Sequence, residues 1–147
     1  MMKIPADFKE FLKLLNANNV KYLLIGGYAV GYYGYPRPTG DFDIWIKIEE
    51  ENAKRTIKAL NTFGFSSPDL TKELLLKEKQ IVRMGLPPFR LEVLTHIDGV
   101  DFEECFAEKE IVDLDGVSAN LISLRHLKIN KQASGRFKDL NDLENLP

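Results

Sequence analysis

The sequence predicts an α/β domain in which a mixed β-sheet is flanked by helices. Stretches with helical periodicity alternate with short apolar runs of strand length, which is typical of this fold class. Glycine, proline and asparagine separate these stretches at most of the expected boundaries. The 147 residues, 44% of them hydrophobic and 29% charged, are enough for one folded domain with its own core.

The N-terminal half is expected to begin with an amphipathic helix. Pro5 is allowed in its first turn, and the apolar positions that follow share one helical face. The later segments are, in order, a strand over 20–25, a short helix over 28–33, a loop over 35–40, a strand over 41–48 and a helix over 50–63.

The C-terminal half is expected to contain two strand pairs and further helices. The strongest local signal is Asp115-Gly116, a pair that favours a tight hairpin turn. Ser123 is a suitable N-cap for the helix that follows, and Gly135 ends it. The segments are, in order, a short helix over 74–76, strands over 81–84 and 90–95, a short helix over 102–106, strands over 111–114 and 117–119, and helices over 123–133 and 138–146.

We expect a single domain over residues 1–147, with a core over about 20–119 and a C-terminal helical part over about 121–146. The charge of −2 gives no reason to expect strong non-specific binding to nucleic acid. No apolar run approaches the roughly 20 residues of a membrane span, and the N-terminus has no signal-peptide core. Cys105 is the single cysteine, in apolar and acidic surroundings that suit a packing role. The expected location is the cytoplasm, without a membrane partner.

Asp41 and Asp43 are the first candidate site. Two apart in a predicted strand, they leave the same face with Cα atoms about 6.6 Å apart, close enough to converge on one hard cation. Like charges on one strand face are unfavourable unless a positive group lies between them. The alternative is a solvent-exposed strand edge that binds nothing.

The second candidate site is the Gly26-Gly27 turn, which follows a strand and precedes a helix. Without Cβ atoms, the backbone can approach a phosphate within hydrogen-bond distance. The alternative is a tight strand-to-helix turn without a ligand.

Taken together, the runs 24–30 and 37–44 resemble the nucleotidyltransferase superfamily, which includes DNA polymerase beta and the small antibiotic nucleotidyltransferases. The Arg-x-Thr-x-Asp-x-Asp run at 37–43 and the C-terminal runs 121–131 and 135–143 are similar to its stand-alone branch of minimal nucleotidyltransferases and abortive-infection toxins. Glu92 stands where that family usually has its third carboxylate, an aspartate.

The resemblance implies a mixed sheet with a nucleoside triphosphate and Mg²⁺ in a cleft, ATP being the expected nucleotide. An acceptor hydroxyl on a protein, a tRNA or a small molecule would attack the α-phosphate and release pyrophosphate. The implied metal ligands and catalytic residues are Asp41, Asp43 and Glu92. The implied nucleotide-binding residues are Gly26, Gly27, Arg37, Thr39, Lys131, Arg136 and Lys138.

Residues 121–138 contain no acidic side chain, although the chain is acidic overall. Lys131, Arg136 and Lys138 match the family pattern, and their cationic groups suit phosphate. A solvated helix face is the simpler interpretation of the other basic residues there. Asp139 and Asp142 are expected to orient Arg136 or to cap the last helix.

Two functions follow, and the sequence leaves both open. The chain is either an active nucleotidyltransferase or a nucleotide-binding antitoxin or partner module of a two-gene toxin–antitoxin system, with little or no turnover. A fold relative that has lost its metal site is a third alternative, which the intact carboxylate pair opposes.

Overall fold

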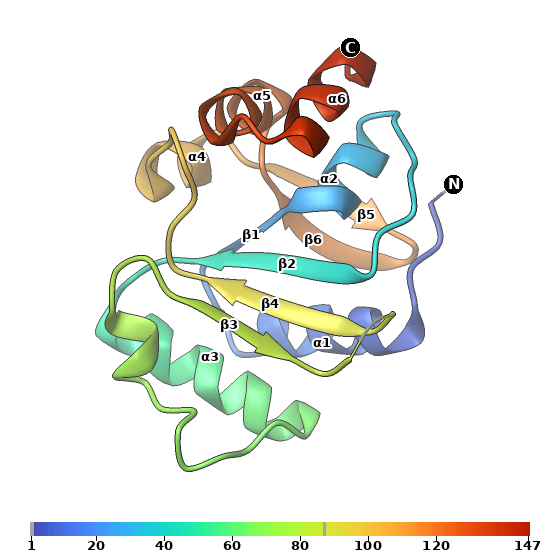
Figure 1. Ribbon diagram of the computed structural model, residues 1–147. Coiled ribbons are helices and arrows are strands. Elements are labelled where there is room, and N and C mark those ends of the chain that lie inside the picture. The colour runs from blue at the N-terminus through green and yellow to red at the C-terminus, as the bar shows by residue number, and fades with distance from the viewer. Residues whose placement is uncertain (1, 87) are drawn as a thin grey trace.

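The computed structural model describes residues 2–86 and 88–147, and six strands in this part form one sheet in the order β3-β4-β2-β1-β6-β5 (Figure 1). The strands are β1 (Tyr22–Ile25), β2 (Asp41–Ile46), β3 (Ile81–Met84), β4 (Arg90–Leu94), β5 (Glu110–Leu114) and β6 (Val117–Leu121). The sheet is mixed: β1 is parallel to β6, and β2 to β4, whereas the other neighbours are antiparallel. The expected α/β fold class is confirmed.

Helices lie on both sides of this sheet (Figure 1). On one side are α1 (Ala6–Ala17) and α3 (Glu50–Phe63), followed by a 3₁₀ turn, η1 (Leu74–Leu76). On the other are α2 (Gly26–Tyr32), α4 (Phe102–Ala107), α5 (Leu124–Ser134) and α6 (Phe137–Asn145). None of the described helices is both long and apolar enough to cross a bilayer.

The core explains why β2 presents its carboxylates on one face only. Phe42, Ile44 and Ile46 are fully buried, and the Phe42 ring stacks on Phe8 of α1 with a centroid distance of 4.7 Å. Each such buried side chain contributes roughly 1.5–3 kcal/mol relative to an exposed one. Because strand side chains alternate, Asp41 and Asp43 must leave the opposite face, where they share a cleft with residues of α5 and α6.

The strand register places charged residues side by side across three strands. In the parallel pair of β2 and β4, Asp41 is opposite Arg90 and Asp43 is opposite Glu92. In the antiparallel pair of β3 and β4, Glu92 is opposite Arg83. The sheet therefore forms one face that carries three carboxylates and two guanidinium groups.

Most expected elements are found, and the differences are at their ends. The helix expected from residue 28 begins at Gly26, directly after β1, so the diglycine is its first turn. The strand expected to reach Ile48 ends at Ile46, because the chain turns there toward α3 and leaves Ile48 37% exposed. The hairpin at Asp115 and Gly116 forms as predicted, with positive φ at both residues.

Candidate functional site

Three carboxylates form the centre of the candidate site. Asp41 and Asp43 come from β2 and Glu92 from β4, and one oxygen of each lies within 4.8 Å of the others. The spacing follows from the fold, since Asp41 and Asp43 are two apart on one strand and Glu92 is the cross-strand neighbour of Asp43. The structure thus brings together the three residues that the sequence suggested as metal ligands.

The Asp43 carboxylate is the least satisfied of the three. Its Oδ1 is buried and has no hydrogen-bond partner among the described residues. The pKa of Asp43 is raised to about 8, first by burial and then by the carboxylates of Glu92 and Asp41, while Lys138 partly opposes this rise. A buried carboxylate oxygen without a partner is costly unless a cation or a proton supplies one. The oxygen-only donor set fits a hard divalent cation such as Mg²⁺.

Two arginines from the same sheet neutralise the other carboxylates. Arg90 donates from Nε and Nη2 to the two oxygens of Asp41, at 2.8 and 3.1 Å. Arg83 donates from Nε to Glu92 at 2.7 Å. Neither arginine is among the site residues that the sequence suggested. Arg90 had a usable signal, because it stands two residues before Glu92 in the same strand and so on the same face. Arg83 required the pairing of β3 with β4.

The diglycine turn lies against the carboxylates. Gly26 has a φ of +73°, and a Cβ atom there would lie 2.1 Å from Asp43 Oδ2. Only glycine therefore fits beside Asp43 at this position. A Cβ on Gly27 would lie 2.7 Å from Thr39 Oγ1 and 3.3 Å from Arg37 Nη1, so the chain packs closely here as well.

A cleft of about 580 Å³ opens over the carboxylates. This volume lies within the usual range of roughly 300–1,000 Å³ for small-molecule sites. One wall is the sheet, and the other comes from α5 and the start of α6. Among the residues that the sequence suggested, the cleft is lined by Gly26, Asp41, Asp43, Glu92, Lys131, Arg136 and Lys138. It is also lined by residues that the sequence did not suggest as ligands, among them Lys79, Ile81, Arg83, Arg90, Asp98 and Asn130.

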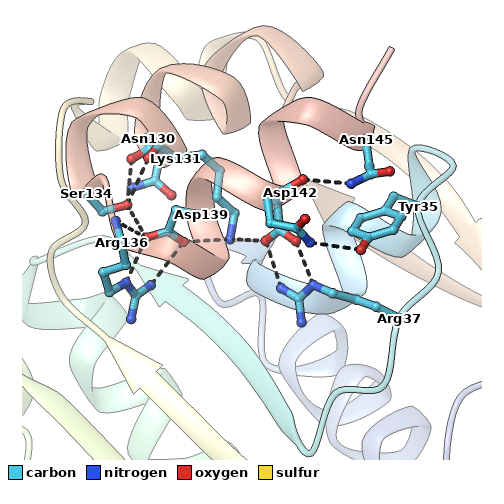
Figure 2. A network of polar contacts seen from close by, with 10 residues as sticks. Tyr35, Arg37, Asn130, Lys131, Ser134, Arg136, Asp139, Asp142 and Asn145 are labelled. Carbon is cyan, nitrogen blue, oxygen red and sulfur yellow. Dashed lines mark hydrogen bonds and ion pairs between the residues drawn. The ribbon is translucent and has the colours of Figure 1, made fainter.

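A network of ion pairs fixes α5 and α6 beside the sheet (Figure 2). Asp142, fully buried, accepts two hydrogen bonds from Arg37 at 2.7 and 2.9 Å and pairs with Lys131 at 3.0 Å. Asp139, also fully buried, pairs with Lys131 at 3.2 Å and with Arg136 at 2.7 Å. The network links the loop before β2 to both C-terminal helices.

The electrostatics of this network explain how buried charges are tolerated. Burial alone would raise the pKa of Asp139, but hydrogen bonds from Arg136, Ser134 and Lys131 hold it below its usual value. Asp139 also accepts a hydrogen bond from the backbone N–H of Arg136 at 3.3 Å, so it caps the start of α6 as well as orienting the Arg136 side chain, as expected. Removing one partner would leave a buried charge uncompensated.

The suggested phosphate-binding residues fall into two groups. Arg136, with a side chain 67% exposed, and Lys138 present their cationic groups at the cleft. The side chains of Lys131 and Arg37 are only 4% and 17% exposed, and both are paired with Asp142. Direct phosphate contact by these two paired residues stays a prediction, while their observed contacts hold the cleft wall in place.

The histidines and the cysteine lie apart from the carboxylates. His96 lines the cleft but is not one of the triad, and its Nε2 lies 3.5 Å from Asp98 Oδ1. His126 is buried and its Nδ1 lies 3.0 Å from Ser123 Oγ. Cys105 is buried, and burial raises the pKa of its thiol to about 12, which confirms its expected packing role.

Comparison with known proteins supports the fold. The sequence matches no protein-family model and no curated protein. Among solved structures, a candidate nucleotidyltransferase from Thermotoga maritima matches with a TM-score of 0.59 and 19% identity, over 93% of this chain and 86% of that chain. An antigenic nucleotidyltransferase-like protein from Paracoccidioides brasiliensis matches with a TM-score of 0.56 and 19% identity, over 93% of this chain and 72% of that chain. The chain therefore has a nucleotidyltransferase-like fold, which by itself does not establish a function.

Proposed function

We propose that the chain is a Mg²⁺-dependent nucleotidyltransferase that moves NMP from a nucleoside triphosphate, ATP in the simplest case, to a hydroxyl group of an acceptor. The observation that carries this proposal is the carboxylate triad with an unpartnered buried oxygen, at the base of a cleft whose opposite wall is basic. Both expected parts of the chain, 20–119 and 121–146, supply cleft residues. We therefore treat residues 1–147 as one functional domain.

The reaction exchanges one phosphorus–oxygen bond for another. The acceptor oxygen bonds to the α-phosphorus, the bond from that phosphorus to the bridging oxygen breaks, and pyrophosphate leaves with its electron pair. The acceptor proton goes to a carboxylate, for which Glu92 is the candidate because its side chain is only 13% exposed and lies beside Asp43.

The roles of the remaining residues follow from their positions. Asp41, Asp43 and Glu92 would hold Mg²⁺, which supplies charge stabilisation for the transferred phosphoryl group. Arg136 and Lys138 lie on the opposite wall and would orient the phosphates. Gly26 allows the backbone to approach Asp43 and the phosphates without a Cβ clash. The protein's part is mainly positioning and electrostatic stabilisation.

A second candidate function is a nucleotide-binding antitoxin or partner module. The observation that favours it is an apolar stripe on α6 next to the cleft, where Phe137 is 92% and Leu140 is 44% exposed. These residues are three apart, so they share one face of the helix. Exposed apolar side chains of this size suit contact with another protein, for example the cognate toxin.

Titration calorimetry of Mg²⁺ with a non-hydrolysable ATP analogue tests the shared first step. Asn at both Asp41 and Asp43 keeps the side-chain shape and removes two charges, so we expect the metal-dependent part of the affinity to be lost. Asn at both Asp7 and Asp69, which are exposed and outside the cleft, is the matched control. Unchanged affinity in the Asp41/Asp43 double variant would show that the metal assignment is wrong.

A further inference from the structure

The guanidinium group of Arg90 lies against two of the carboxylates that would hold a metal ion. A metal that binds there would have to displace it. The guanidinium spans both oxygens of Asp41, at 2.8 and 3.1 Å, and its Nη2 is 3.8 Å from Glu92. The group therefore lies between two of the three suggested metal ligands. In the metal-free protein, a protein side chain provides the positive charge that the carboxylates require.

A divalent cation and this guanidinium oppose each other. The two N–H groups of Arg90 use one lone pair on each Asp41 oxygen, and a positive charge a few ångströms away repels a second cation. The pair is only partly shielded from water, with Arg90 31% and Asp41 28% exposed. It is therefore strong enough to form in the metal-free state and accessible enough to exchange.

The backbone of Arg90 can stay in place while its side chain moves. Arg90 N donates to Gly40 O at 3.2 Å, and Asp41 is its partner in the parallel ladder. The side chain lines the cleft, where nucleotide phosphates would lie. Arginine pairs with phosphate as well as with carboxylate, through the same planar set of donors.

We propose that Arg90 is a displaceable counter-ion of the metal site: it holds Asp41 until the metal binds and then turns to the phosphates of the incoming nucleotide. This inference rests on the proposed nucleotide and metal site. It adds that metal and nucleotide bind with positive coupling, because the metal frees a guanidinium that the phosphates then use. The metal alone binds weakly, since it must first break the pair between Arg90 and Asp41.

Binding of Mn²⁺, followed by the loss of the free-ion signal in electron paramagnetic resonance, measures the competition without any turnover. The probes are Mn²⁺ alone and Mn²⁺ with an ATP analogue that has a methylene group between the α- and β-phosphorus. In Arg90→Gln we expect Mn²⁺ alone to bind about tenfold more tightly, or ~1.4 kcal/mol, and the Mn²⁺-dependent affinity for the analogue to fall. Arg125→Gln is the matched control, because Arg125 forms the same two-pronged pair with Glu108 outside the cleft.

The outcomes separate the inference from the function on which it rests. If the native protein binds Mn²⁺ with the analogue but Arg90→Gln binds Mn²⁺ alone no better than native protein, Arg90 is not a competitor and the inference fails by itself. If the native protein binds neither probe, the proposed function fails and this inference with it.

A conservative variant keeps the test valid should Arg90→Gln fail to fold, as judged by circular dichroism. Arg90→Lys retains the charge but loses the two-pronged pair, so Mn²⁺ alone should bind about threefold more tightly than to native protein. Native-like Mn²⁺ affinity in a folded Arg90→Lys would also overturn the inference.

Discussion

Replacing Asp43 with asparagine should stabilise the metal-free protein while it removes metal binding. The pKa of Asp43 is raised from 3.8 to about 8, first by burial and then by the neighbouring carboxylates. Between these two pH values the folded protein holds a proton that the unfolded chain has released. Stability from this group is therefore present at acid pH and is lost as the pH rises from about 4 to about 8. Asparagine cannot ionise and avoids this loss.

The size of the effect follows from the same pKa. A change from 3.8 to about 8 corresponds to an upper limit of about 6 kcal/mol in the free energy of unfolding above pH 8. Water entry from the cleft relieves part of this cost, so we expect about 1–3 kcal/mol. For a chain of this length, that is an increase of roughly 3–10 °C in melting temperature.

Thermal unfolding in EDTA at pH 5 and pH 8.5 measures this prediction. Asp43→Asn should gain little over the native protein at pH 5 and most at pH 8.5, whereas Asp69→Asn, on the surface, should show no such gain. Added Mg²⁺ should stabilise the native protein and not Asp43→Asn. A lower melting temperature for Asp43→Asn than for the native protein at pH 8.5 would refute the claim that the ionised Asp43 carboxylate destabilises the metal-free protein.

Three further substitutions address other parts of the site. Gly26→Ala would place a Cβ 2.1 Å from Asp43 Oδ2, so Mg²⁺ affinity measured by calorimetry should fall about tenfold or more; native-like affinity would show that the carboxylate moves freely. Asp142→Asn would deprive Arg37 of its buried partner at 2.7 Å, and chemical denaturation should show a loss of about 3–5 kcal/mol; a loss under 1 kcal/mol (roughly the value of a surface pair) would contradict the structural role. Glu92→Gln should keep most nucleotide affinity and slow single-turnover transfer by roughly 10²–10⁴, and a native rate would remove Glu92 from proton transfer.

Local sequence patterns predicted the helices and strands, and they also predicted that the two aspartates of the site share one face. The alternation of Phe42, Ile44 and Ile46 with Asp41 and Asp43 depends only on strand geometry, so the shared face of the carboxylates could be predicted without the fold. The hairpin and the helix caps are equally local, because turn residues act through their own backbone.

The remaining features depend on contacts between distant segments. The pairing of Asp41 with Arg90 requires that β2 lies beside β4 and parallel to it. The order of strands in a sheet cannot be predicted from the sequence of either strand alone. Lys131 and Arg37 look like free phosphate ligands in the sequence, yet both pair with Asp142, which is far from Arg37 along the chain. A pattern of basic residues in a sequence cannot show whether their side chains already form ion pairs within the protein.

Incubation with α-³²P-labelled nucleoside triphosphates tests the central claim most directly. The chain would be supplied with Mg²⁺, each of the four nucleotides in turn, and a cell lysate as the source of acceptors. We predict that label transfers to a macromolecule or small molecule with release of pyrophosphate, and that the Asp41/Asp43 double asparagine variant transfers none. Equal labelling by native protein and the double variant, or no labelling by a native protein that binds the nucleotide and Mg²⁺, would contradict the claim that this site is a working nucleotidyltransferase centre.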